Sequence, residues 1–116
     1  MDILTKADIL KAVDNRTKKV DCPEWGGSVL VSTMSGFARD QFEGSIVGKG
    51  GGTNTTNIRA KLAVATVVDE QGNLIFNEKD IAALGKKSAV ALDRIFSASQ
   101  ELNKITDDDV EDMAKN

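Results

Sequence analysis

Apolar residues recur at helical spacing in several segments of the chain, and polar turns separate these segments. The clearest segment is 88–103, where Ser88 can cap the first free amides of a helix. Its apolar stripe contains Leu92, Ile95, Phe96, Ser99 and Leu102. At about 1.5 Å per residue, such a helix would nearly cross a domain of this size.

Three shorter helices are predicted over 5–13, 35–47 and 78–84. Their capping side chains are Thr5 with Asp8, Ser35, and Asn77 with Asp80. The first helix carries Ile9, Leu10 and Val13 on one face, and the second carries Phe37, Phe42, Ile46 and Val47. Gly85 is expected to close the third helix in the C′ position, where glycine is favoured.

The run from 58 to 68 is apolar nearly all round and suits a buried strand as well as a buried helix. Its length and its charged lead-in, Arg59 and Lys61, favour a helix. A turn is expected over 69–73, followed at 74–76 by a short extended piece or an apolar anchor.

A β-hairpin is predicted between 19–22 and 28–32, because β-branched residues there flank a turn-forming sequence. Pro23 fixes its own φ, and Gly26 and Gly27 can both take positive φ. We expect Trp25 to fold back onto a strand.

Two polar segments are set apart from the rest. Residues 48–57 contain glycine, asparagine and threonine without an apolar residue, which predicts a flexible loop. A phosphate loop does not fit there, because Lys49 is followed by Gly50 rather than by Ser or Thr. Residues 106–115 are predicted to form an acidic helix with its aspartates at the positive end of the helix dipole.

These elements predict an α+β fold that is predominantly helical. A short N-terminal helix and the β-hairpin are followed by a helical bundle of about four to five helices. The 116 residues fit a single domain, 1–116, and 41% hydrophobic with 28% charged residues is a globular composition.

The residue types that the sequence lacks exclude several kinds of functional site. The sequence has no histidine and one cysteine, Cys22, which removes histidine-based catalysis, an internal disulfide and a multi-cysteine metal site. We expect no catalytic residue, no metal and no cofactor. The net charge of −3 argues against nucleic acid as a partner. No secretory signal or membrane-spanning run is visible, so we expect no membrane partner and a cytoplasmic location.

Apolar helix faces are the remaining candidate for function. The residues expected to build the core, or to contact a second copy or a client polypeptide, are Leu62, Val64, Val67, Val68, Leu92, Ile95, Phe96 and Leu102. The interpretation that all of this surface is internal core is equally open.

The order of segments resembles the short tail assembly chaperones of long-tailed bacteriophages, of the type found in siphophages with an HK97-like tail gene order. The most specific matches are the hairpin around Pro23-Glu24-Trp25-Gly26-Gly27 and the segment Leu84-Gly85-Lys86-Lys87-Ser88. Further matches are Arg39 to Glu43, Val67 to Phe76 and Leu92 to Phe96. The loop at 48–57 departs from the pattern expected of the family.

The resemblance implies a non-enzymatic role in the host cytoplasm. Such proteins keep the tape measure protein soluble, help to recruit tail tube subunits and are absent from the finished tail. Some members also exist as a longer frameshift product. From the apolar helix faces we also expect self-association, since copies of a small unit would repeat these faces along an extended client. Two other interpretations stay open: a head–tail connector or neck protein of the virion, and a small enzyme with a carboxylate site.

Overall fold

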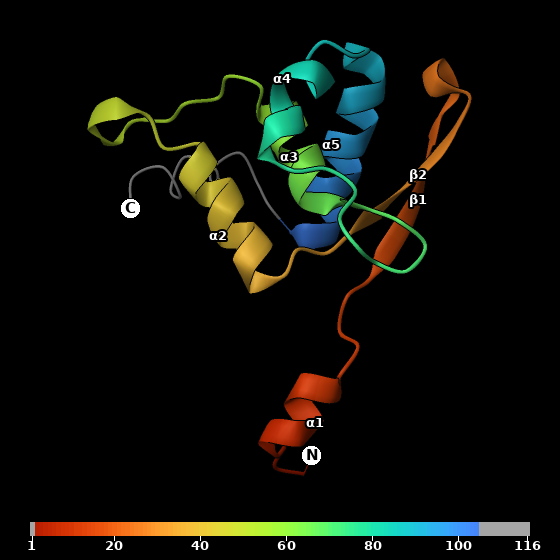
Figure 1. Cartoon of the computed structure of the whole chain (residues 1–116), viewed down its shortest axis with the longest axis vertical. Helices are drawn as coiled ribbons and strands as arrows, with labels where there is room; N and C mark the ends of the chain where they lie inside the picture. The colour runs from red at the N-terminus through yellow and green to blue at the C-terminus, as the bar shows by residue number, and fades with distance from the viewer. Residues whose placement is uncertain (1, 105–116) are drawn as a thin grey trace.

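The computed structural model describes residues 2–104, and within them it contains five α-helices and a three-stranded antiparallel sheet (Figure 1). The elements are α1 (Lys6–Lys11), β1 (Thr17–Cys22), β2 (Gly27–Ser32), α2 (Gly36–Ser45), α3 (Ile58–Thr66), β3 (Val67–Val68), α4 (Ile81–Leu84) and α5 (Ala89–Asn103). Short 3₁₀ turns are η1 (Pro23–Trp25), η2 (Lys49–Gly51) and η3 (Glu78–Asp80). The predicted α+β class is confirmed, while the helix predicted at 106–115 lies outside the described residues.

The main core lies where α3 and α5 pack against each other and against the hairpin (Figure 1). Val31, Ala63 and Ile95 are almost fully buried there, each at most 1% exposed. Between the two helices, the Thr66 hydroxyl donates to the Leu62 carbonyl at 2.7 Å and lies 2.9 Å from the Ser99 hydroxyl. This buried polar contact is fully hydrogen-bonded, so it does not oppose the packing around it.

A second, smaller core lies under α2. Phe42 of α2 and Ile46, which directly follows α2, bury their side chains against Leu62 and Ala65 of α3. Leu62 therefore belongs to the face of α3 that α2 covers, whereas Ala63 and Val67 belong to the main core. An all-round apolar helix is what this position between two partners requires.

The run predicted as one helix over 58–68 divides at residue 66. Ile58–Thr66 is helical as expected, but Val67 and Val68 form β3, where Val67 pairs with Val31 and Val68 with Leu30. Two β-branched residues placed beside an open strand edge gain ladder hydrogen bonds and burial that a further helical turn would not give them. β1 pairs with β2 from Thr17↔Ser32 to Cys22↔Gly27 and, within residues 2–104, has no strand on its other side.

The hairpin turn uses the predicted residues. Pro23 begins η1, Gly26 follows with φ 75°, and Gly27 starts β2. Trp25 remains 38% exposed at the tip. The tip is held to α5 by Glu24, whose carboxylate accepts a 2.5 Å hydrogen bond from Arg94.

The predicted helix starts are confirmed at Thr5, Ser35, Asn77 and Ser88, and each side chain accepts a hydrogen bond from a backbone amide of the first turn. Gly85 follows α4 as predicted, but its φ of −63° is right-handed, so the proposed C′ geometry is wrong. Glycine has a different effect there. A Cβ at residue 85 would lie 2.6 Å from the Asn57 side-chain oxygen, so any other residue would require the Asn57 side chain to shift.

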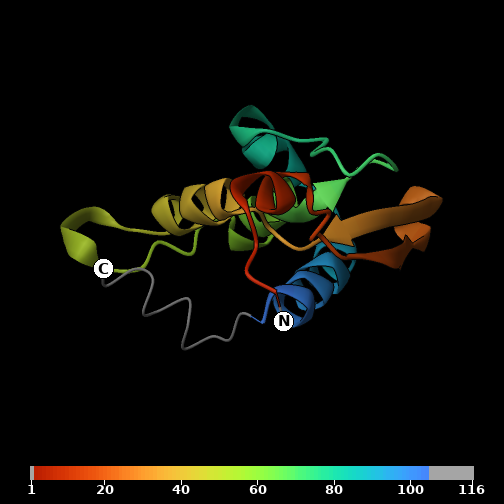
Figure 2. The ribbon, with the colours of Figure 1, turned by 90° about the horizontal axis from the view of Figure 1, so that it is seen from below.

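The segment 48–57 and the hairpin extend from opposite sides of the body (Figure 2). In the segment, η2 follows α2, and Val47 forms an isolated bridge with Thr53. Its predicted flexibility stays a prediction.

Candidate functional site

Residues 2–13, here called the arm, project from the body and consist of α1 with short extended segments on either side (Figure 1). The helix has a complete capping box: the Asp8 amide donates to Thr5 Oγ1 at 3.2 Å, and the Thr5 amide donates to Asp8 at 2.9 Å. These contacts hold the pKa of Asp8 below its usual value, first through the Thr5 amide and then through its hydroxyl. The capping is therefore local and needs no support from the body.

The arm exposes its apolar side chains. The exposed fractions are 94% for Ile3, 57% for Ile9, 74% for Leu10 and 89% for Val13. No residue of α1 is buried. A helix of six residues is marginal in water, because few backbone hydrogen bonds offset its nucleation. The arm thus combines a short helix with an apolar face that the body does not cover.

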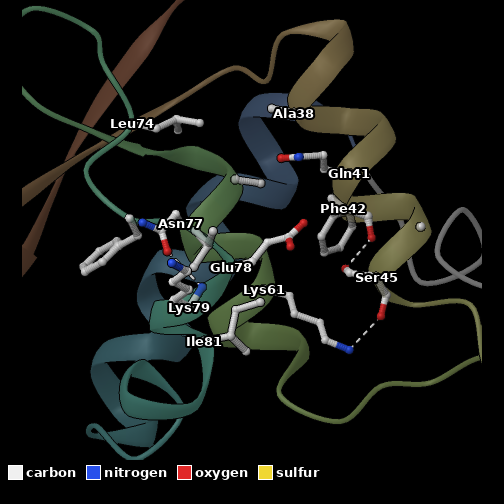
Figure 3. Close-up of a pocket in the computed structure, with 14 residues that line it drawn as sticks. Ala38, Gln41, Phe42, Ser45, Lys61, Leu74, Asn77, Glu78, Lys79 and Ile81 are labelled. Carbon is white, nitrogen blue, oxygen red and sulfur yellow. Dashed lines mark hydrogen bonds between the residues drawn. The ribbon is translucent and has the colours of Figure 1, made fainter.

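A groove runs along the body between α2 and the segment 74–81, with α3 as its floor. It consists of two adjoining hollows of about 810 and 550 Å³, which share Ala38, Ala65 and Leu74 in their walls. The larger hollow is lined by apolar atoms of Phe42, Val64, Phe76 and Ile81 (Figure 3). The smaller one ends at Asp14, Asn15 and Arg16, the residues that join the arm to β1.

Lys61 brings a cation into this groove from α3. Its ammonium donates to the Ser45 carbonyl at 2.7 Å (Figure 3). Among residues 2–104 it forms no ion pair, and burial lowers its pKa because desolvation disfavours the charged form. Glu78 and Lys79 stand on the opposite wall.

Asn103, at the end of α5, holds the base of α2 beside the groove. Its side chain accepts from the Met34 amide at 2.7 Å and donates to the Ser32 carbonyl at 3.3 Å. The end of β2 and the start of α2 are thus fixed by one amide that the hydrophobic pattern gave no reason to single out.

The eight residues expected to serve as core or contact surface lie mostly inside. Leu62, Val67, Val68, Leu92 and Ile95 are buried, and Val64, Phe96 and Leu102 are partly buried against the two cores. The exposed large apolar residues lie elsewhere: in the arm, at Trp25, Phe37, Val47 and Val90, and at Leu74 and Ile75. The periodicity of 5–13 marked the arm as apolar, but nothing in it indicated that this face is exposed.

Residues 2–104 provide no cluster of three or more side chains that could hold a metal ion. Cys22, the last residue of β1, is buried in the main core, and desolvation raises the pKa of its thiol, which disfavours the reactive thiolate. No helix within the described part of the chain is long and apolar enough to cross a membrane. The arm and the groove are the apolar surface features of residues 2–104 described above.

The described residues thus form a small α+β body with an exposed apolar arm and an apolar groove. The sequence model of the phage tail assembly chaperone family matches residues 6–116, and the chain belongs to that family. This confirms the resemblance found in the sequence and indicates a non-enzymatic role.

A solved structure described as that of the bacteriophage HK97 tail assembly chaperone has the same fold, with a TM-score of 0.59. The two chains are 20% identical, and the match covers 79% of this chain and 85% of the other. At this identity the comparison supports the fold alone. Comparison with curated proteins gives no match.

Proposed function

We propose that this protein binds the phage tape measure protein in the host cytoplasm, keeps it soluble and helps to recruit tail tube subunits, and then leaves before the virion is complete. The observation that carries the proposal is membership of the tail assembly chaperone family over residues 6–116. The exposed apolar residues support it, because a partner with long amphipathic helices needs apolar surface to cover its own.

Coexpression tests the proposal. A tape measure protein from the same phage is expressed with and without this chain, and the soluble fraction is measured after centrifugation. We expect the chain to raise that fraction and to co-purify with the tape measure protein. An unchanged soluble fraction without co-purification would contradict the proposed binding.

Substitutions on the body locate the contact. Phe37 is 73% exposed on α2 and Ile75 is 51% exposed beside the groove, so Phe37→Asp with Ile75→Asp should reduce co-purification at least fivefold. Ser97→Asp with Thr56→Asp adds the same two charges at exposed polar positions and serves as the control. Mass spectrometry of purified particles completes the test, since an intact chain in mature virions would indicate a structural component such as a connector.

A further inference from the structure

Two opposite charges line the larger hollow of the groove without pairing with each other. Lys61 enters from α3 and Glu78 from the opposite wall, and among residues 2–104 neither side chain belongs to an ion pair. We propose that the groove binds one amphipathic helix of the client, with acidic residues of that helix facing Lys61 and basic residues facing Glu78. This inference rests on the proposed function for the existence of a client, and it adds the surface and the kind of helix that binds there.

The groove has an apolar floor about as long as a short helix. Val64 and Ala65 of α3 form the floor, and Leu74 and Ile81 belong to one wall. Leu74 is 47% exposed, so it has apolar area left to bury. The other wall is α2, whose 10 residues span about 15 Å. A helix that lies alongside α2 would therefore be contacted over about three turns, which is the usual i, i+3, i+4 and i+7 set of apolar anchors.

Both charged side chains are positioned before a partner binds. The Lys61 ammonium donates to the Ser45 carbonyl at 2.7 Å, and this contact directs it toward the α2 wall (Figure 3). Glu78 lies in η3, where the Asn77 amide donates to the Asp80 carboxylate at 2.9 Å. From there the Glu78 side chain points toward α2 (Figure 3). Groups that are positioned beforehand lose less conformational entropy when a partner pairs with them.

The two charges should contribute unequally to recognition. Lys61 is partly buried, and burial lowers its pKa because the charged form is desolvated. An incoming carboxylate would offset this cost, and salt screens a partly buried ion pair less than an exposed one. Glu78 is exposed, and exposed ion pairs contribute little. Acidic residues of the client helix should therefore determine most of the selectivity, through Lys61.

Designed peptides test this selectivity in the full-length protein. Two stapled, fluorescently labelled helices carry the same stripe of leucines. One helix has glutamate along one flank of the stripe and lysine along the other, and the second has lysine along both flanks. We expect the unchanged protein to bind the glutamate–lysine helix at least fivefold more tightly, measured by fluorescence anisotropy. The net charge of −3 on the protein favours the all-lysine helix, so overall charge would give the opposite order.

Substitutions at Lys61 separate this pairing from general attraction. Lys61→Glu should reverse the order of the two peptides, because both walls of the groove are then acidic. Lys61→Met keeps the apolar stem and removes the charge, so it should abolish the preference for glutamate even if the reversed charge impairs folding. Lys86→Glu makes the same charge change at an exposed position outside the groove and should preserve the original order. Circular dichroism checks that each variant is folded.

An apolar substitution tests whether the peptide lies in the groove. Leu74→Asp should weaken binding of the glutamate–lysine helix at least tenfold, because it places a charge on the apolar wall. Val90→Asp makes the same change on α5, where Val90 is 55% exposed and lies outside the groove. It should change the affinity less than twofold.

Four results would overturn the inference: no binding of either peptide, equal binding of both, an order that Lys61→Glu leaves unchanged, and equal losses for Leu74→Asp and Val90→Asp. A peptide copying residues 2–13 or 105–116 that binds more tightly than the designed helix would also overturn it, because the groove would then take a segment of this chain.

The peptide test and the coexpression test fail separately, because the peptides contain no tape measure sequence. Coexpression that succeeds while the peptides fail would remove this inference alone. Peptides that bind as expected while coexpression fails would remove the proposed client and leave the selectivity of the groove established.

Discussion

The arm and α5 have the same kind of sequence pattern and opposite surroundings. Each begins with a hydroxyl cap, Thr5 or Ser88, and each carries large aliphatic residues at helical spacing. Ile95 of α5 is 1% exposed, whereas Ile9 of the arm is 57% exposed. The comparison teaches that a hydrophobic pattern predicts which face of a helix will be covered, but not whether the same molecule will cover it.

The largest expected difference between the two regions is in core packing. Ile95→Ala should lower the free energy of unfolding by about 2–5 kcal/mol, because it removes buried methyl groups and leaves a cavity between α3, α5 and the hairpin. Ile9→Ala should change it by less than about 0.5 kcal/mol, as expected of an exposed position. Urea unfolding at low protein concentration measures both. Equal effects would mean that the arm packs on its own body.

The next effect concerns the buried hydroxyl pair of α3 and α5. Thr66→Val removes the partner of Ser99 and should cost about 1–3 kcal/mol of stability, since a buried hydroxyl is left unsatisfied. Thr66→Val with Ser99→Ala removes both hydroxyls and should recover part of that loss. A double-mutant cycle by denaturant unfolding measures the coupling. Strictly additive effects would indicate that the two hydroxyls do not interact.

Loss of a helix cap should have a smaller effect on stability, and the caps of α5 and α1 can be compared directly. Ser88→Ala should destabilise the whole fold by about 1 kcal/mol, because its hydroxyl accepts from the Ala91 amide at the start of a helix in the core. Thr5→Ala removes the equivalent bond in the arm and should leave global unfolding unchanged. It should instead increase hydrogen exchange at the α1 amides. A lower free energy of global unfolding for Thr5→Ala would contradict the independence of the arm.

The smallest effect depends on pH. The Arg94 hydrogen bond holds the pKa of Glu24 below its usual value of 4.5. A group whose pKa is lowered in the folded state contributes stability above its unfolded pKa and loses it as the pH falls through the folded value. The Glu24–Arg94 contribution should therefore be present at pH 7 and decline below about pH 4.5. Glu24→Gln should flatten this part of the stability curve, measured by thermal unfolding, while Asp8→Asn in the arm should leave it unchanged.

Local sequence rules accounted for much of the fold. Helix caps, the Pro23–Gly27 turn and the Asp69 turn depend on hydrogen bonds between residues close in sequence. The residue types in a short window therefore predict each of them. β3 could not be predicted in this way, because Val67 and Val68 are extended only through pairing with Leu30 and Val31, distant in the chain. Gly85 was singled out correctly but for the wrong reason, since its neighbour Asn57 is 28 positions away.

The candidate site was harder to predict than the fold. The residues proposed from the sequence, such as Leu62 and Ile95, lie in strongly apolar segments. Such residues are usually buried, and these two lie in the core. The groove is formed by residues from α2, α3 and the segment 74–81, which no single window of sequence combines. The arm was visible as an apolar helix, and only the three-dimensional arrangement shows it uncovered.

The outer edge of β1 affects how readily this protein aggregates through strand pairing. Strand edges left open readily recruit extended chains into amyloid-like ladders, and charged side chains along them oppose this. β1 carries Lys18, Lys19 and Asp21 among its six residues. An uncharged apolar edge at this position would favour strand-by-strand aggregation. These three charges disfavour the addition of another strand at this edge.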